Sequence, residues 1–95
     1  MFKIQNNQVR KCVQNREEFS NAGGTLYGGQ IDRKYVVYSY GKHFPLLIWD
    51  GKCWHGNKDK YSKTTSKHLS QAIPVSRDLI RWHDTDEMVA LVRAL

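Results

Sequence analysis

The chain has 95 residues, of which 40% are hydrophobic and 25% are charged, and its formal net charge at pH 7 is +6. This length predicts a single small domain, residues 1–95, with one hydrophobic core, and the composition excludes a disordered or fibrous protein. No stretch approaches the ~18 consecutive apolar residues of a membrane-spanning helix, and the first residues lack the apolar run of a signal peptide. We therefore expect a cytoplasmic protein without a membrane partner, in which Cys12 and Cys53 are free thiols.

The first predicted element is a short amphipathic helix near the N-terminus. Val9, Cys12 and Val13 have the spacing of one helical face, and Asn7 is a suitable N-cap. A cluster of Ser, Asn and Gly follows at residues 20–24 and favours a turn. The helix should therefore end between residues 15 and 19.

The centre of the chain predicts an antiparallel meander. Asp50-Gly51 separates two apolar, β-favouring runs, which is a strong hairpin signal because a type I′ turn needs positive φ at both central positions. Pro45 has no N–H for a ladder hydrogen bond, so its strand should begin one residue later. Gly28-Gly29 should stop a brief strand that precedes the meander and is either an edge strand or a bulged strand. The expected strands are Thr25–Tyr27, Lys34–Tyr40, Leu46–Trp49 and Lys52–His55.

Each face of this sheet is expected to be covered, either by helices of this chain or by a partner surface, because both faces of its first two long strands are apolar or aromatic. Residues 84–95 predict a helix with a capping box, in which Asp84 is the cap and Glu87 lies three residues on. A short helix is expected between Thr64 and Ala72, whereas residues 75–83 fit neither helical nor strand periodicity. The predicted fold is α+β, with a three- to four-stranded antiparallel meander packed against an N-terminal and a C-terminal helix.

The run from Lys52 to His68 concentrates positive charge, with five lysines against the single acid Asp59. Such clustering favours an anionic partner. Lysines would contact phosphates, hydroxyls would act as neutral donors, and two aromatics would stack on bases. The predicted nucleic-acid or anion-binding residues are Lys52, Trp54, Lys58, Lys60, Tyr61, Lys63, Thr64, Thr65, Ser66, Lys67 and His68. The alternative is a solvated loop whose lysines only keep the domain soluble, with Trp54 and Tyr61 in the core.

Other chemistry has weaker support from the residues. Cys53 and His55 should share one face of a strand, but no C-x₂-C or H-x₃-H pattern accompanies them, so neither a metal site nor a cofactor is predicted. In a small phosphodiester-cleaving enzyme, His43 and His68 would be the acid and base, and Lys67 would assist them. The spacing of these residues does not favour this function. We therefore predict no catalytic residue.

Aromatic residues support a second class of function, in which the protein docks on another protein or on a second copy of itself. Interfaces are enriched in Tyr, Trp and Arg at their centres. Tyr38 and Trp49 are expected in the core, whereas Tyr40, Trp54 and Tyr61 lie nearer turns and are candidates for exposure. This hypothesis gives a protein-binding inhibitor or a self-associating module.

Three short motifs, Tyr35–Gly41, His43–Pro45 and Asp59–His68, resemble those of a group of small proteins encoded by tailed bacteriophages. The similarity covers roughly residues 16–74 and transfers no activity and no functional residue. It implies a setting inside a bacterium, where such proteins often bind nucleic acid, nucleic-acid enzymes or defence complexes of the host. We therefore expect a non-enzymatic accessory protein that binds nucleic acid, or an acidic or nucleic-acid-bound host protein.

Overall fold

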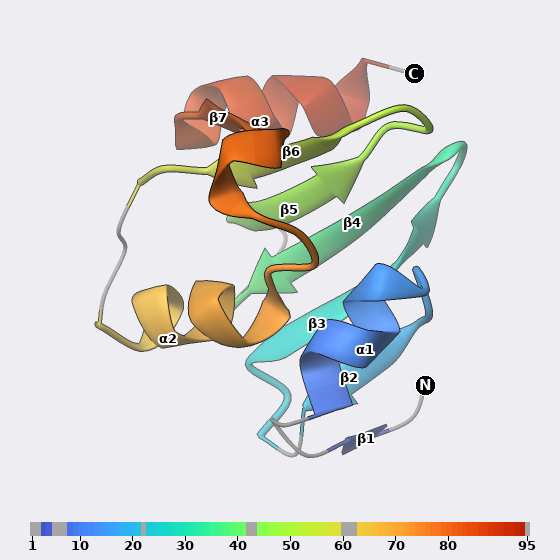
Figure 1. Cartoon of the computed structure of the whole chain (residues 1–95), viewed down its shortest axis with the longest axis vertical. Helices are drawn as coiled ribbons and strands as arrows, with labels where there is room; N and C mark the ends of the chain where they lie inside the picture. Colours follow the sequence, from blue (N-terminus) through green and yellow to red (C-terminus); the bar gives the residue numbers. More distant parts are fainter. Residues whose placement is uncertain (1–2, 5–7, 22, 42–43, 60–62, 95) are drawn as a thin grey trace.

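The structure is a computed structural model that describes residues 3–4, 8–21, 23–41, 44–59 and 63–94, with the backbone alone for residues 3–4 and 63–66. These residues form one seven-stranded sheet with three α-helices packed on it (Figure 1). The strands are β1 (Lys3–Ile4), β2 (Phe19–Asn21), β3 (Leu26–Ile31), β4 (Lys34–Ser39), β5 (Pro45–Trp49), β6 (Trp54–Asn57) and β7 (Ile80–His83). The helices are α1 (Val9–Gln14), α2 (Lys63–Ala72) and α3 (Thr85–Arg93), and a 3₁₀ turn, η2 (Arg77–Leu79), precedes β7.

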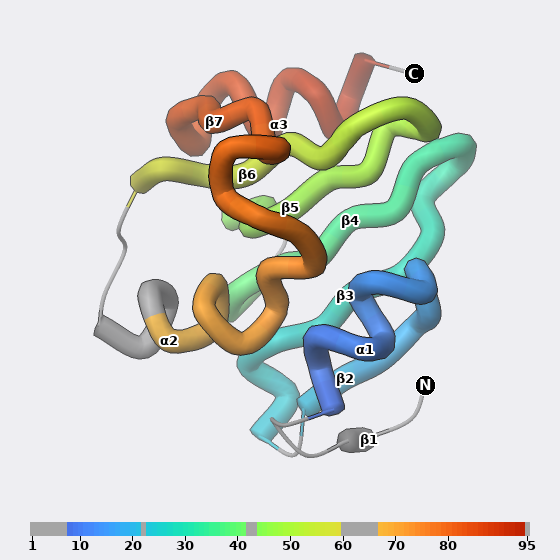
Figure 2. Tube along the Cα trace, viewed as in Figure 1, coloured from blue at the N-terminus to red at the C-terminus, as the bar shows by residue number. Residues whose placement is uncertain are grey.

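The α+β class is confirmed, but the sheet is larger than predicted and is mixed. The strands lie in chain order across it, so that the colours in Figure 2 run from blue at one end to red at the other. Strands β2 to β6 are antiparallel, as expected of a meander, while β1 pairs in parallel with β2 and β7 pairs in parallel with β6. The prediction of three or four antiparallel strands is therefore wrong at both edges.

Helices α1 and α2 lie in the two connections between parallel neighbours, from β1 to β2 and from β6 to β7. Strands β1 and β6 run in the same direction, and both connections step the same way across the sheet. Crossovers of this kind are right-handed in nearly all proteins, so both must put their helix on the same face. Accordingly, α1 and α2 contact each other in front of the sheet in Figure 1.

Two hydrophobic clusters fill the space between the sheet and its helices. The larger lies under α1 and α2 and includes Val9, Val13, Phe19, Tyr35, Leu47 and Ala72. The smaller lies under α3, where Met88 packs with Val36, Tyr38 and Ile48. Helices of this chain thus cover both faces of β4 and β5, which is one of the two alternatives that their two-sided apolar pattern leaves open.

Strand β3 continues through the glycines that were expected to end it. A Cβ at Gly28 would lie 2.8 Å from the Phe19 ring and 2.9 Å from the Tyr35 hydroxyl oxygen. The missing side chain therefore makes room for two buried aromatics, and the Tyr35 hydroxyl donates to the Glu17 carbonyl at 2.7 Å. Gly28 is a site of close packing and not a strand terminator.

The predicted hairpin and the predicted capping box of α3 are both confirmed, but the hairpin loop differs from the predicted type I′ turn. The hairpin loop spans four residues, Asp50 to Cys53, between the paired Trp49 and Trp54; Gly51 has φ of 100°, and Asp50 is not among the described positive-φ residues. It is therefore not a two-residue type I′ turn. At α3, Asp84 and Glu87 form the predicted capping box.

The N-terminal helix is confirmed over Val9–Gln14, with Gln8 in the cap position. The short helix predicted between Thr64 and Ala72 is confirmed as α2. The predicted cap Asn7 lies outside the described residues. Among the described helices, none has the length and apolar character needed to cross a membrane.

Candidate functional site

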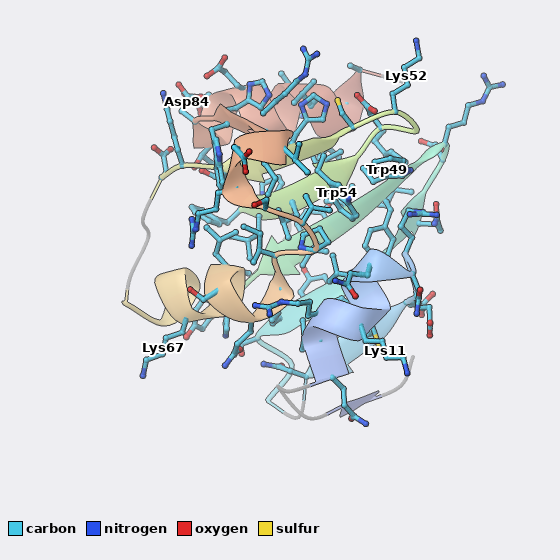
Figure 3. All side chains as sticks on the ribbon, viewed as in Figure 1. Lys11, Trp49, Lys52, Trp54, Lys67 and Asp84 are labelled. Carbon is cyan, nitrogen blue, oxygen red and sulfur yellow. The ribbon has the colours of Figure 1, made fainter. Side chains whose placement is uncertain are left out.

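The predicted anion-binding segment is divided between a strand, a loop and a helix. Of its residues, Lys52, Lys58 and Lys67 are exposed. Lys52 and Lys67 lie at opposite ends of the molecule in Figure 3, so these two lysines do not belong to one patch. Lys60 and Tyr61 lie outside the described residues, as do the side chains of Lys63, Thr64, Thr65 and Ser66, which belong to the first half of α2.

The prediction that Trp54 faces solvent is wrong. Its side chain is 6% exposed and belongs to the larger hydrophobic cluster. It packs edge to face on Tyr35, with 6.3 Å between ring centroids, and against Trp49 at 5.3 Å. Alternate residues of a strand point to opposite faces, and at this position β6 points toward the helices α1 and α2. Trp54 is therefore a core residue that does not present its ring to a base.

His68 is also buried, which removes it from the predicted anion-binding residues. Its Nδ1 lies 2.9 Å from the Ser39 hydroxyl, and its ring lies beside that of Tyr40, with 5.6 Å between centroids. Burial lowers the pKa of His68, because the protonated ring loses its hydration. The proposed catalytic pairing with His43 is untested, since His43 lies outside the described residues.

The buried His68 gives a testable pH dependence. Its pKa is lower in the folded chain than in the unfolded chain, so the unfolded state binds more protons as the pH falls through about 6.5. The free energy of unfolding should therefore decrease between about pH 7 and pH 5, and His68→Gln should flatten this decrease. Urea denaturation at a series of pH values measures the slope; equal slopes for the wild type and the variant would contradict the assignment.

Asp59, the single acid of the Lys52–His68 run, is used in the fold. Its Oδ2 accepts hydrogen bonds from the backbone N–H and the hydroxyl of Thr85, both at 2.8 Å. These two bonds lower the pKa of Asp59. The carboxylate thus ties the end of β6 to the first turn of α3, where a negative charge also suits the helix dipole. After Asp59, the next acid in the sequence is Asp78. The lysines between them therefore have no acidic neighbour in the sequence.

A basic face that the sequence reading missed is formed by α1 and α2 together. Arg10, Lys11 and Lys67 are exposed, and the Arg10 guanidinium donates to the Ser70 carbonyl, which joins the two helices. Neither α1 nor α2 contains an acid, and together their sequences hold four Lys and Arg residues: Arg10, Lys11, Lys63 and Lys67. We call this surface, on the described residues of α1 and α2, the helical face.

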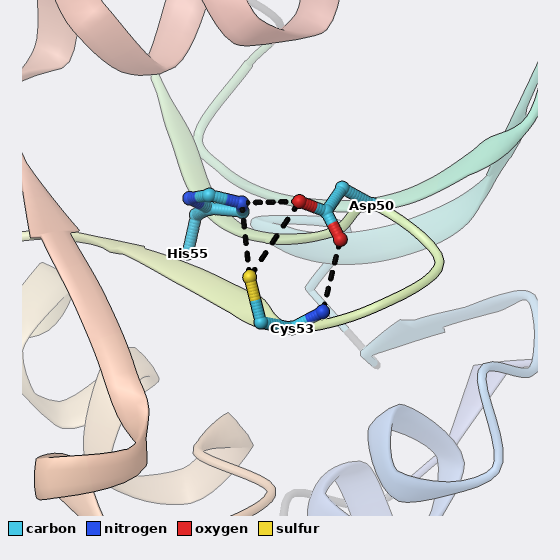
Figure 4. Close-up of side chains that lie close together, drawn as sticks. All are labelled: Asp50, Cys53 and His55. Atoms are coloured by element: carbon cyan, nitrogen blue, oxygen red, sulfur yellow. Dashed lines mark hydrogen bonds and ion pairs between the residues drawn. The ribbon is translucent and has the colours of Figure 1, made fainter.

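A polar cluster occupies the opposite side of the sheet, at the β5–β6 loop (Figure 4). Asp50 Oδ2 lies 2.7 Å from His55 Nε2, and Cys53 Sγ lies 3.6 Å from each of these two atoms. The other oxygen of Asp50 accepts the backbone N–H groups of Lys52 and Cys53, at 2.8 and 2.9 Å. The loop thus folds the carboxylate back over the strand, and all three ligand-type atoms lie within 4.8 Å of one another.

The cluster continues from His55 into α3. His55 Nδ1 lies 2.9 Å from His83 Nε2, and His83 Nδ1 lies 3.7 Å from a carboxylate oxygen of Glu87. The expectation that Cys53 and His55 share a face is confirmed, and β7 adds His83 because it pairs in parallel with β6. No spacing in the sequence indicates that His83 and Glu87 join the cluster.

The pKa values of Asp50 and Cys53 are shifted in opposite directions. Partial desolvation raises the pKa of Asp50, but the hydrogen bonds from His55 and from the Cys53 and Lys52 N–H groups outweigh it and leave the pKa well below its usual range. Desolvation and the nearby Asp50 charge raise the pKa of Cys53, although Arg81 acts in the opposite direction. The thiol is thus protonated at neutral pH, which argues against Cys53 as an activated nucleophile.

A cavity of about 290 Å³ adjoins this cluster, between the sheet and the end of α3. Asp50 and His55 line it together with Lys34, Lys52, Ile48, Leu91 and Ala94. Lys34 is buried and donates from Nζ to the carbonyl oxygens of Leu91 and Val92, at 2.7 and 2.6 Å. The cavity is therefore lined by apolar side chains of β5 and α3 and by the polar side chains of Asp50 and His55.

Comparisons of the chain with models of protein families, with curated proteins and with solved structures found no match.

Proposed function

We propose that the protein binds nucleic acid without catalysing a reaction, and that the helical face is the binding surface. The observation that carries this proposal is that α1 and α2 contain no acid and hold four Lys and Arg residues. Cations that gather without acids attract a polyanion, and each phosphate contact releases counterions. The surface thus replaces the continuous Lys52–His68 patch expected from the sequence.

The composition of the helical face favours nucleic acid over a protein partner. Protein interfaces centre on large aromatic or apolar anchors. Among the described residues, the large hydrophobic side chains that are exposed are Tyr40 and Leu79. Tyr40 lies against His68 of α2, so it borders the helical face and offers one ring on which an unpaired base would stack. An aromatic at the edge of a cationic surface suits single-stranded nucleic acid.

A charge-neutralising triple variant tests this surface. Arg10→Gln, Lys11→Gln and Lys67→Gln together should weaken binding to a labelled single-stranded oligonucleotide about 10-fold or more at low salt. Each lost phosphate contact should also reduce the slope of log K against log salt concentration by about 0.7. Fluorescence anisotropy across a salt series measures both quantities.

A matched triple, Arg33→Gln, Lys52→Gln and Arg93→Gln, removes the same charge from exposed positions outside α1 and α2. It should lower the affinity less and keep most of the salt slope. Equal losses in the two triples would place binding elsewhere on the chain. Absence of salt-sensitive binding by the wild type to DNA and RNA, single- or double-stranded, would overturn the proposed function.

The bacteriophage setting belongs to the same proposal. The resemblance of the motifs around Tyr35–Gly41 and Asp59–His68 suggests a protein made inside a bacterium. A basic face on a small protein in that compartment would meet host or phage nucleic acid, free or held by an enzyme. Protein docking through aromatics, the alternative class, has no comparable support in the described residues, where most aromatics are in the core.

A further inference from the structure

We propose that Asp50, Cys53 and His55 bind a zinc ion and leave its fourth coordination position open. The proposal is independent of nucleic-acid binding, because the site lies on the α3 side of the sheet and the helical face on the other. Thiolate and imidazole are ligands that zinc prefers over magnesium or calcium, and carboxylate oxygen is also common in zinc sites. Three protein ligands are the usual number in zinc sites that keep a position for water or a substrate.

The distances within the cluster are close to those of a tetrahedral zinc site. Zinc bonds of about 2.3 Å to sulfur and about 2.0 Å to nitrogen or oxygen, at a tetrahedral angle, put the sulfur about 3.5 Å from the other two atoms. Cys53 Sγ lies 3.6 Å from both His55 Nε2 and Asp50 Oδ2. The remaining edge, 2.7 Å between Asp50 Oδ2 and His55 Nε2, is a hydrogen bond, and it would lengthen to about 3.3 Å when zinc replaces the shared proton.

Neighbouring groups hold two of the three ligands, Asp50 and His55, in the way that is usual for zinc sites in proteins. Asp50 Oδ1 is occupied by two backbone N–H groups, so the carboxylate presents only Oδ2. Zinc-bound histidines usually donate their second ring N–H to an acceptor, which fixes the tautomer. His55 Nδ1 has such an acceptor in His83 Nε2, and His83 Nδ1 in turn faces Glu87. His83 is thus a positioning residue for His55.

Charge around the site determines which fourth ligand suits it. A carboxylate and a thiolate together neutralise Zn²⁺, so the three cations near the cluster face a site without net charge. These cations are Arg81 beside Cys53, and Lys34 and Lys52 in the wall of the adjoining cavity. They favour water or a small anion, such as phosphate or a carboxylate, in the open position.

Cobalt substitution tests the proposal, because tetrahedral Co²⁺ has intense d–d bands and a cysteine ligand adds a thiolate-to-cobalt charge-transfer band. The purified, reduced full chain is stripped with a chelator and titrated with Co²⁺, and then with Zn²⁺ as competitor. We expect both absorptions to saturate at one Co²⁺ per chain and to disappear when Zn²⁺ is added. Cys53→Ser should abolish the charge-transfer band, whereas Cys12→Ser, which changes the thiol on the opposite side of the sheet, should keep it.

Two further variants separate metal binding from folding. Asp50→Asn keeps an acceptor for the loop N–H groups but removes the charge, and His83→Gln leaves all three ligands in place. We expect His83→Gln to weaken Co²⁺ binding 10- to 100-fold while the charge-transfer band persists at saturation. Zn²⁺ should raise the thermal unfolding midpoint of the wild type and of Cys12→Ser, but not of Asp50→Asn. Absence of a charge-transfer band from the wild type, or its persistence in Cys53→Ser, would overturn the proposal.

Discussion

Lys34→Met is expected to lower the free energy of unfolding by about 2–4 kcal/mol. Lys34 is 1% exposed, and its ammonium group donates to the carbonyls of Leu91 and Val92 in the last turn of α3. Hydrogen bonds that involve a charged group contribute roughly 1.5–3 kcal/mol each, and a cation at a helix C-terminus also interacts favourably with the helix dipole. Methionine keeps most of the apolar stem, so the loss reports mainly on the two bonds.

Urea denaturation followed by circular dichroism measures this change. Arg33→Met is the matched control, because Arg33 is the exposed neighbour of Lys34 in the chain and its replacement should change stability by no more than about 0.5 kcal/mol. If both variants unfold at the same urea concentration, the two hydrogen bonds give no net stabilisation. In that case α3 is held on the sheet by the packing of Met88, Leu91 and Val92 and by the bonds between Asp59 and Thr85.

Gly28→Ala should destabilise the chain by about 1–3 kcal/mol, although alanine adds only one methyl group. That methyl would lie 2.8 Å from a carbon of the Phe19 ring and 2.9 Å from the Tyr35 hydroxyl, so buried aromatics would have to move. The Tyr35 hydroxyl would also be pushed from its bond to the Glu17 carbonyl. The shift in the midpoint of thermal or urea unfolding measures the cost.

The adjacent glycine provides the control for this variant. A Cβ at Gly29 meets its nearest neighbour, the Glu18 side chain, at 3.5 Å, which is ordinary contact. Gly29→Ala should therefore be neutral or slightly stabilising, because alanine loses less backbone entropy on folding. Equal destabilisation by both variants would mean that β3 responds to any side chain, and would contradict the close-packing role of Gly28.

Elements that depend on neighbouring residues in the chain were predictable. The capping box at Asp84 and Glu87 and the hairpin around Asp50-Gly51 are local signals, and both appear in the fold. The parallel edges were not predictable, because β1 has only two residues and β7 has four, and each takes its partner from beyond a helix. A strand that short has no periodicity of its own to detect.

The candidate sites also combine features that local sequence signals predict with features that depend on residues far apart in the chain. Alternation along a strand is local and predicts that Cys53 and His55 share one face, whereas the sequence around Asp50 indicates only a turn. The Asp50 side chain joins Cys53 and His55 because the loop curls back over the strand. The spacing of residues in the sequence does not predict this loop geometry. Likewise, the helical face combines α1 and α2, which lie far apart in the sequence and meet through right-handed crossovers. The lysines near Trp54 in the sequence favour an exposed position, but the pleat of β6 directs its ring into the core.

The position of α1 and α2 in the crossovers also bears on the order in which the chain folds. Strands β2 to β6 are joined by short connections, so their contacts are local and close at little entropic cost. The edge strands β1 and β7 pair only across a connection that contains a helix, so we expect them to dock later. We therefore expect the cationic surface to be completed late in folding, so that a half-folded chain with only the central hairpins has not yet assembled it.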